Sequence, residues 1–98
     1  MSEPIPGMAN RVRESVKSLV GYRSDLIDPI NNIPTETIYQ HGPQGAIERV
    51  ANKKPTDPTD FRQWREFLSA ADTELGPRTV RKWASDVRDA FLAQREAT

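Results

Sequence analysis

Few residues of this chain could take part in chemistry. His41 is the only histidine, and there is no cysteine. A tetrahedral metal site needs four ligands, so a site at His41 would need several carboxylates to converge on it, and no spacing indicates this. We therefore interpret His41 as a solvent-exposed turn residue. Asp57 and Asp60 could form an acid–base pair, but acids directly before an apolar run are typical of helix caps.

Nucleophile and phosphate-binding motifs are also missing. The serines lie in no nucleophile-elbow context, and no G-x-x-x-x-G-K-S/T loop occurs. Residues 42–45 match the bare G-x-x-G of KH domains, but no strand pattern accompanies them, and we interpret them as a turn. We predict a protein that is not an enzyme, has no cofactor, metal or small-molecule substrate, and works by binding.

The amino-acid composition limits which binding partners and which cellular compartment we expect. Fourteen basic and fourteen acidic residues cancel, which removes the overall attraction that supplies most non-specific affinity for nucleic acids. The absence of cysteine favours a reducing or organellar compartment. The longest apolar run, residues 90–93, is far shorter than the roughly 18 to 20 residues of a membrane span. We expect neither a membrane span nor a secretory signal. Residues 8–20 resemble an organellar targeting helix, and an ordinary surface helix explains them as well.

The elements that must position these residues are helical. Apolar residues recur every three or four positions from Met8 and predict a first helix to about Leu26, which ends or kinks before Pro29. A short helical turn is expected around Ile38, and a second short helix from Pro43, which ends before Pro55.

The best-marked helix start is residues 57–60, with Asp57 as the N-cap and Pro58 at the first helical position. The apolar stripe that follows is expected to form the densest part of the core: Phe61, Trp64, Phe67, Leu68, Ala71 and Leu75. Gly76-Pro77 then separates it from the last helix, and so short a turn predicts two antiparallel neighbours.

We predict an all-α fold, a small bundle of three or four helices with proline-rich connectors. Residues 1–7 are expected to be a flexible N-terminus, residues 8–95 a single helical domain, and residues 96–98 a C-terminal tail.

One local segment resembles a DNA-binding sequence. Residues 75–83 are similar to the L-S-x-R-T-V-R-x-Y stretch of tyrosine-recombinase core-binding domains and to helix-turn-helix recognition helices. Such a helix would present three basic residues to phosphates. Asp86 and Asp89 lower the positive charge of this helix. Residues 78–98 carry five basic and three acidic residues, a net charge of only plus two. A solvated helix face is the competing interpretation.

A longer resemblance covers residues 19–83. The chain resembles the alpha-subcomplex subunit 5 family of mitochondrial respiratory complex I, which are helical accessory subunits. The segments that carry it are Leu19-Val20-Gly21, Ile33-Pro34 with Tyr39 five positions after the proline, Glu48-Arg49-Val50, Asp57 to Trp64, Arg65 to Leu75, and Trp83. The sequence departs from the family pattern at Gly42-Pro43, at Pro29, and between Arg49 and Arg65, where it is several residues short.

This resemblance implies a non-catalytic subunit of the peripheral arm of complex I, on the matrix side of the mitochondrial inner membrane, bound to other protein subunits. Aromatic and arginine side chains usually anchor such interfaces. The expected interface residues are Tyr39, Arg62, Arg65, Arg81 and Trp83. Two alternatives stay open: a small cytoplasmic DNA-binding protein that uses residues 76–95, and an unrelated adaptor or virion structural protein.

Overall fold

The computed structural model describes residues 3–96, and the regular secondary structure in this part of the chain is entirely helical. The all-α prediction is confirmed, but the expected number of helices was too small. The six helices are α1 (Met8–Leu19), α2 (Ser24–Asn31), α3 (Thr35–Gln40), α4 (Gln44–Ala51), α5 (Phe61–Glu74) and α6 (Pro77–Glu96). None of these described helices is long and apolar enough to cross a membrane.

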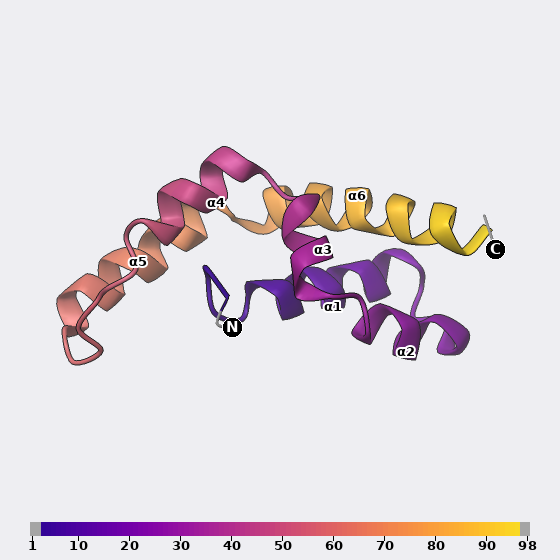
Figure 1. The fold of residues 1–98 in the computed structure, drawn as a ribbon, viewed down its shortest axis with the longest axis horizontal. Coiled ribbons are helices and arrows are strands. Elements are labelled where there is room, and N and C mark those ends of the chain that lie inside the picture. The colour runs from indigo at the N-terminus through magenta and orange to yellow at the C-terminus, as the bar shows by residue number, and fades with distance from the viewer. Residues whose placement is uncertain (1–2, 97–98) are drawn as a thin grey trace.

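The predicted first helix is two helices. α1 ends at Leu19, and the chain then passes through Gly21 at φ 70° and Tyr22 at φ 54°. The N–H of Tyr22 donates a 2.9 Å hydrogen bond to the carbonyl of Lys17, which closes the helix end. This left-handed turn suits glycine because it has no Cβ, and it lets α2 turn back beside α1 (Figure 1).

Pro29 lies inside α2, so helical structure does not end before Pro29, which was one of the two predicted outcomes. A proline removes one N–H from the helical ladder. The ladder resumes directly afterwards, because the N–H of Asn32 still donates to the carbonyl of Asp28 at 3.1 Å. The helix therefore continues to Asn31.

The main body is built around α1 and α6, which lie side by side and run in the same direction (Figure 1). Each helix buries apolar residues at three- and four-residue spacing, which places them on one face. These residues are Met8, Ala9, Val12 and Val16 of α1 and Val80, Trp83, Ala84 and Val87 of α6. They belong to one continuous apolar cluster, which also includes buried residues of α2, α3, α4 and α5. The segment that resembles a targeting helix, residues 8–20, thus contributes buried residues of α1 to this core.

α4 and α5 form an antiparallel pair that projects from the body and gives the molecule its extents of 46 × 26 × 22 Å (Figure 1). The predicted antiparallel pairing of α5 with α6 is wrong: α5 packs on α4, and α6 packs on α1. The Nε of Arg49 lies 2.6 Å from Oε1 of Glu74, which joins the two helices of the arm. Gly76-Pro77 lets the chain continue from the arm into α6 without reversing its direction.

Residues 3–7, which belong to the N-terminal segment predicted to be flexible, pack on the body. Ile5 is buried, with 3% of its surface exposed. A carboxylate oxygen of Glu3 accepts a 2.9 Å hydrogen bond from the N–H of Ala9, in the first turn of α1. A carboxylate stabilises an unpaired N–H group at a helix start. Of the predicted C-terminal tail, Glu96 belongs to α6; residues 1–2 and 97–98 lie outside the described part.

Candidate functional site

Trp83 is a core residue, and its assignment to an interface is therefore wrong. Only 1% of its surface is exposed. Its Nε1 donates a 2.7 Å hydrogen bond to the carbonyl oxygen of Ile38, which satisfies the polar end of the indole ring. The ring lies directly on the backbone at Gly42, where a Cβ would stand 2.6 Å from its Cε2 atom. The break between α3 and α4 thus provides the space that the indole fills.

Tyr39 joins the N-terminal segment to α3. Its hydroxyl lies 3.1 Å from Oε1 of Glu3 and 3.0 Å from the carbonyl oxygen of Ile5, and it packs edge-on against Trp83 at a centroid distance of 5.6 Å. Burial, followed by the charge of the Glu3 carboxylate, raises the pKa of Tyr39 above its ordinary value. The hydroxyl is therefore engaged within the chain, although the residue is only half-buried.

The three predicted arginines are exposed, and the structure places two of them on the same helix. Arg62 and Arg65 lie on α5, whereas Arg81 lies on α6. Arg62 is 3.7 Å from Glu66, a long ion pair between exposed groups that contributes little to stability. Within residues 3–96, Arg65 makes no hydrogen bond or ion pair.

An exposed apolar stripe runs beside these arginines. Phe61 exposes 80% of its surface and Leu68 57%, and Trp64 lies half-buried between them. Positions 61, 64 and 68 fall on one side of a helix. We refer to these three residues as the α5 stripe.

The α5 stripe corrects the predicted core. Of the six apolar residues expected there, only Phe67, Ala71 and Leu75 are buried. α4 has eight residues and α5 fourteen. At about 1.5 Å per residue the shorter helix cannot cover the first turn of the longer one, where Phe61 lies. Leu68 follows the buried Phe67 directly, so its exposure depends on the side of α5 on which it lies. The difference in length between the two predicted segments is the sequence signal that could have found Phe61.

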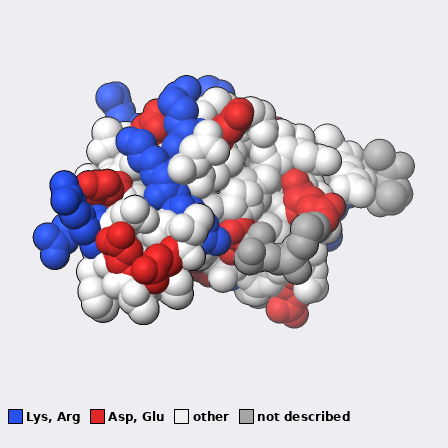
Figure 2. Space-filling model, turned by 60° about the vertical axis from the view of Figure 1, so that its left-hand side comes forward, with Lys and Arg blue, Asp and Glu red and all other residues white. Residues whose placement is uncertain are grey.

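The charges on the arm are mixed. Figure 2, which brings the α4–α5 end forward, shows a band of lysine and arginine side chains with aspartate and glutamate side chains next to it. Close charges of both signs weaken each other's field at a distance. The face in this view therefore carries charges of both signs, unlike the single-sign surfaces that attract nucleic acid without sequence preference.

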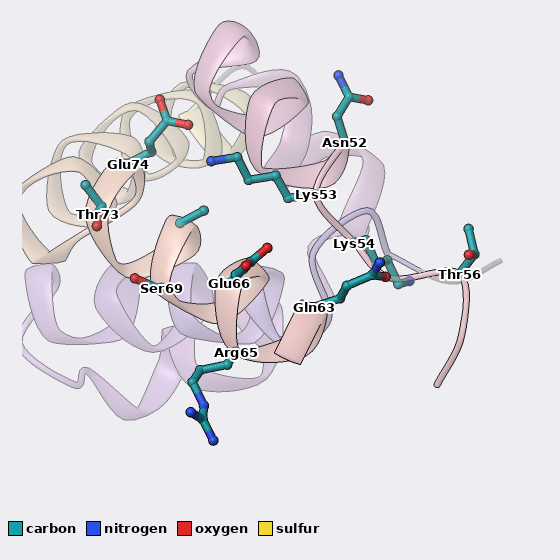
Figure 3. A pocket seen from close by; sticks show the side chains of 11 residues that line it. Asn52, Lys53, Lys54, Thr56, Gln63, Arg65, Glu66, Ser69, Thr73 and Glu74 are labelled. Carbon is teal, nitrogen blue, oxygen red and sulfur yellow. The ribbon is translucent and has the colours of Figure 1, made fainter. Parts of the chain in front are cut away.

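A groove of about 820 Å³ lies between the end of α4 and α5. Lys53 extends into it from the α4 side, and Glu66 and Glu74 approach from α5, whereas Arg65 points away (Figure 3). The groove is wide and carries both signs of charge, so it does not select one class of small ligand. Arg65 is thus directed toward the outside of the arm.

The acids and the histidine that could have supplied chemistry have structural roles. Oδ1 of Asp60, and not Asp57, caps α5 by accepting from the N–H of Gln63 at 3.1 Å. Oδ1 of Asp57 accepts from the N–H and the hydroxyl of Thr59, at 2.9 and 2.7 Å, and these hydrogen bonds lower the pKa of Asp57. His41 is half-buried at the C-cap of α3, not the solvent-exposed turn residue that we expected. Among residues 3–96 no three His, Cys, Asp or Glu side chains are grouped so that they could hold a metal ion.

Comparisons with known proteins do not identify the chain. No family model, curated protein or solved structure matches it. Among residues 3–96, two of the three large hydrophobic residues that are exposed, Phe61 and Leu68, belong to the α5 stripe.

Proposed function

We propose that this protein is a non-catalytic accessory subunit that binds a protein partner through the α5 stripe. The observation that carries the proposal is the exposure of Phe61 and Leu68, at 80% and 57%, on one side of one helix. Covering a large apolar side chain in an interface stabilises the complex by about 1.5 to 3 kcal/mol. Aromatic residues are also the most frequent anchors of protein interfaces.

The charges beside the stripe indicate the chemistry of the partner. Arg65 lies between Phe61 and Leu68 in the sequence, points away from the groove of the arm (Figure 3) and has no partner within residues 3–96. A guanidinium group pairs best with a carboxylate, to which it can donate two parallel hydrogen bonds. We infer that the partner presents an apolar helix face or groove with carboxylates on its rim.

The assembly is indicated by the sequence resemblance alone. That resemblance supports the peripheral arm of respiratory complex I as the partner, and the matrix side of the mitochondrial inner membrane as the location. A small helical subunit that docks sideways on a large complex needs one anchored face and no active site of its own. The α5 stripe is suited to this role.

The test is native electrophoresis of detergent-solubilised mitochondrial membranes that contain the tagged protein. We expect the wild-type chain to migrate with complex I. A Phe61→Ser, Leu68→Ser double variant should leave that band while keeping its helical circular dichroism. The matched control is Tyr22→Asn, which removes an aromatic ring that is 61% exposed and lies far from α5 in the sequence. Asparagine tolerates the left-handed backbone at this position, so this variant should still migrate with the complex.

Two outcomes contradict the proposal. If the wild-type chain never migrates with complex I, the assignment to that assembly is wrong. If the double variant migrates with a large complex as well as the wild type does, the α5 stripe is not the docking surface.

A specific observation favours a second function, DNA binding through α6. Arg78, Arg81 and Lys82 are exposed in the first two turns, and the first turn contains no acidic residue. Cations at this end of a helix are unfavourable for the helix dipole, so an anionic partner would relieve the repulsion. Two features weigh against it: Lys82 lies 3.4 Å from Asp86, and α5 does not pack on α6 as the paired helices of a helix-turn-helix motif do.

Gel-shift titrations of duplex DNA at low and moderate salt decide between the two functions. DNA binding would give a shift that weakens steeply with salt and is reduced by Arg78→Ala and Arg81→Ala. The proposal of an accessory subunit requires that the wild-type protein show no such shift.

A further inference from the structure

A second cleft lies in the body of the molecule, and none of its lining residues belongs to α4 or α5. It has a volume of about 330 Å³ and is formed by the end of α2, the connector to α3, α3 itself and the last half of α6. Its apolar walls are Pro29, Ile33, Pro34, Val87, Ala90 and Phe91. In Figure 1 these elements lie between the middle of the view, where α3 is labelled, and its right-hand side, where α6 ends.

The lining of this cleft is uncharged. None of the ten residues that line it is Asp, Glu, Lys or Arg, whereas 29% of the chain is charged. Arg95 lies nearby, with its guanidinium carbon 5.5 Å from the centroid of the Phe91 ring, but it is not one of the lining residues. An ionic ligand would leave its solvation without gaining an opposite charge, which is costly. The cleft therefore favours a neutral ligand.

Polar side chains also line the cleft. Thr37 and His41 are half-buried, whereas Asn32 and Gln94 are exposed to solvent. Within residues 3–96 none of these four side chains makes a hydrogen bond to another protein group. An amide, a hydroxyl and an imidazole can each donate and accept hydrogen bonds. Apolar walls with a few uncommitted polar groups are the usual composition of a small-molecule site.

We propose that this cleft binds a small, uncharged aromatic molecule. The rings of Pro29, Pro34 and Phe91 provide flat apolar surfaces for a planar ring. The volume is close to the lower limit of ligand pockets, about 300 Å³, and so suits one or two rings. Thr37 and His41, which line the cleft, have a hydroxyl and an imidazole that can hydrogen-bond a neutral polar substituent on that ring. The site is separate from the α5 stripe, and the proposal does not depend on the function assigned to the stripe.

Three nearly isosteric probes test the proposal: neutral benzamide, anionic benzoate and cationic benzamidine. Each is titrated into the full-length ¹⁵N-labelled protein and followed by two-dimensional NMR. We expect saturable shifts for benzamide at the amides of Ile33, Thr37, His41 and Ala90, with a dissociation constant on the order of 1 mM. The two charged probes should bind at least tenfold more weakly.

Variants on one helix provide the matched controls. Ala90→Phe fills the cleft and should abolish the benzamide shifts, whereas Ala93→Phe places the same ring at an exposed position outside the lining and should leave them unchanged. Thr37→Val removes a hydroxyl at nearly constant volume and should weaken binding several-fold. The spectrum of each free variant shows whether the fold is kept.

The proposal is overturned if benzamide gives no saturable shifts at these amides, or if Ala90→Phe binds it as tightly as Ala93→Phe does. It is also overturned if benzoate or benzamidine binds as well as benzamide, because the site would then not select for a neutral ligand.

Discussion

Gly42 is the residue on which the packing of the body depends most directly. A Cβ at this position would lie 2.6 Å from Cε2 of Trp83 and 2.7 Å from Cδ1 of Ile47. Both neighbours are buried and cannot move without disturbing the core. The glycine is thus required here for close approach, and not for a positive φ.

We expect Gly42→Ala to lower the free energy of unfolding by about 1 to 3 kcal/mol, the usual cost of overpacking. The matched control is Gly45→Ala. This glycine lies exposed within α4, and its Cβ would meet only the flexible end of Arg49, at 3.3 Å. Alanine is the better helix former, so the control should stabilise the protein by about 0.5 to 1 kcal/mol. Urea denaturation measures both, and equal effects would contradict the packing of Trp83 on residue 42.

Tyr39 should make the stability of the protein depend on alkaline pH. Its pKa in the folded state is raised above the ordinary value of 10.0, so the native state keeps the proton to higher pH than the unfolded chain does. The contribution is complete below pH 10 and is lost as the pH rises further. At neutral pH, Tyr39→Phe should lower the free energy of unfolding by about 1 kcal/mol, the usual contribution of one hydrogen bond.

Denaturation curves between neutral and alkaline pH test this expectation. The difference in stability between the wild type and Tyr39→Phe should shrink as the pH rises above 10, because only the wild type can lose this proton. Tyr22→Phe is the control at neutral pH, since Tyr22 is 61% exposed and the change should stay within about 0.5 kcal/mol. A constant difference at all pH values would mean that the Tyr39 hydroxyl is not buried against Glu3.

Among the elements, α5 shows how a helix start is decided. Two acids precede it, and the sequence pattern favours Asp57 with Pro58 at the first helical position. The structure instead begins the helix at Phe61, because Asp57 accepts both of its hydrogen bonds from Thr59. Asp60 is then the acid that reaches the free N–H of Gln63.

We expect Asp60→Ala to lower the free energy of unfolding by about 0.5 to 2 kcal/mol, the usual effect of removing an N-cap. Asp57→Ala should have a smaller effect, because Asp57 is exposed and stabilises only a loop turn. Thermal unfolding of the two variants measures the difference. If Asp57→Ala lowered the stability more than Asp60→Ala, Asp57 would be the N-cap of α5.

Over the whole molecule, packing is uneven between the body and the arm. α1 buries five of its twelve residues, whereas α5 buries three of its fourteen, namely Phe67, Ala70 and Ala71. The arm is also joined to the body through short connections at both of its ends, Gly42-Pro43 and Leu75-Gly76. Elements with little buried apolar surface open more readily than the core does.

The rates of native-state hydrogen exchange should therefore differ between the α4–α5 arm and the body. We expect the central amides of α5 to exchange at least about tenfold faster than those of α1 and α6. A partner that covers the α5 stripe should slow exchange in α5 more than in α1. Uniform protection of α1, α5 and α6 would show instead that the arm and the body open as one unit.

The sequence by itself determined the helical class, because apolar residues recur at the helical period, and it located most of the breaks, because glycine and proline interrupt helices at Gly42-Pro43, Pro55 and Gly76-Pro77. Arg62 and Arg65, which it predicts as interface residues, are exposed in the structure, and their role in an interface stays a prediction. The periodicity of one helix shows which side is apolar, but it does not show which neighbour covers that side.

Only the tertiary structure decided which apolar residues are covered. Trp83 is buried because α6 packs on α1 and the chain at Gly42 leaves room for the indole ring. Phe61 is exposed because α5 packs on a shorter helix, α4, and not on α6, and Leu68 is exposed because it lies on a side of α5 that no other helix covers. Burial of a side chain depends on contacts between segments far apart in the sequence, and helical periodicity contains no information about those contacts.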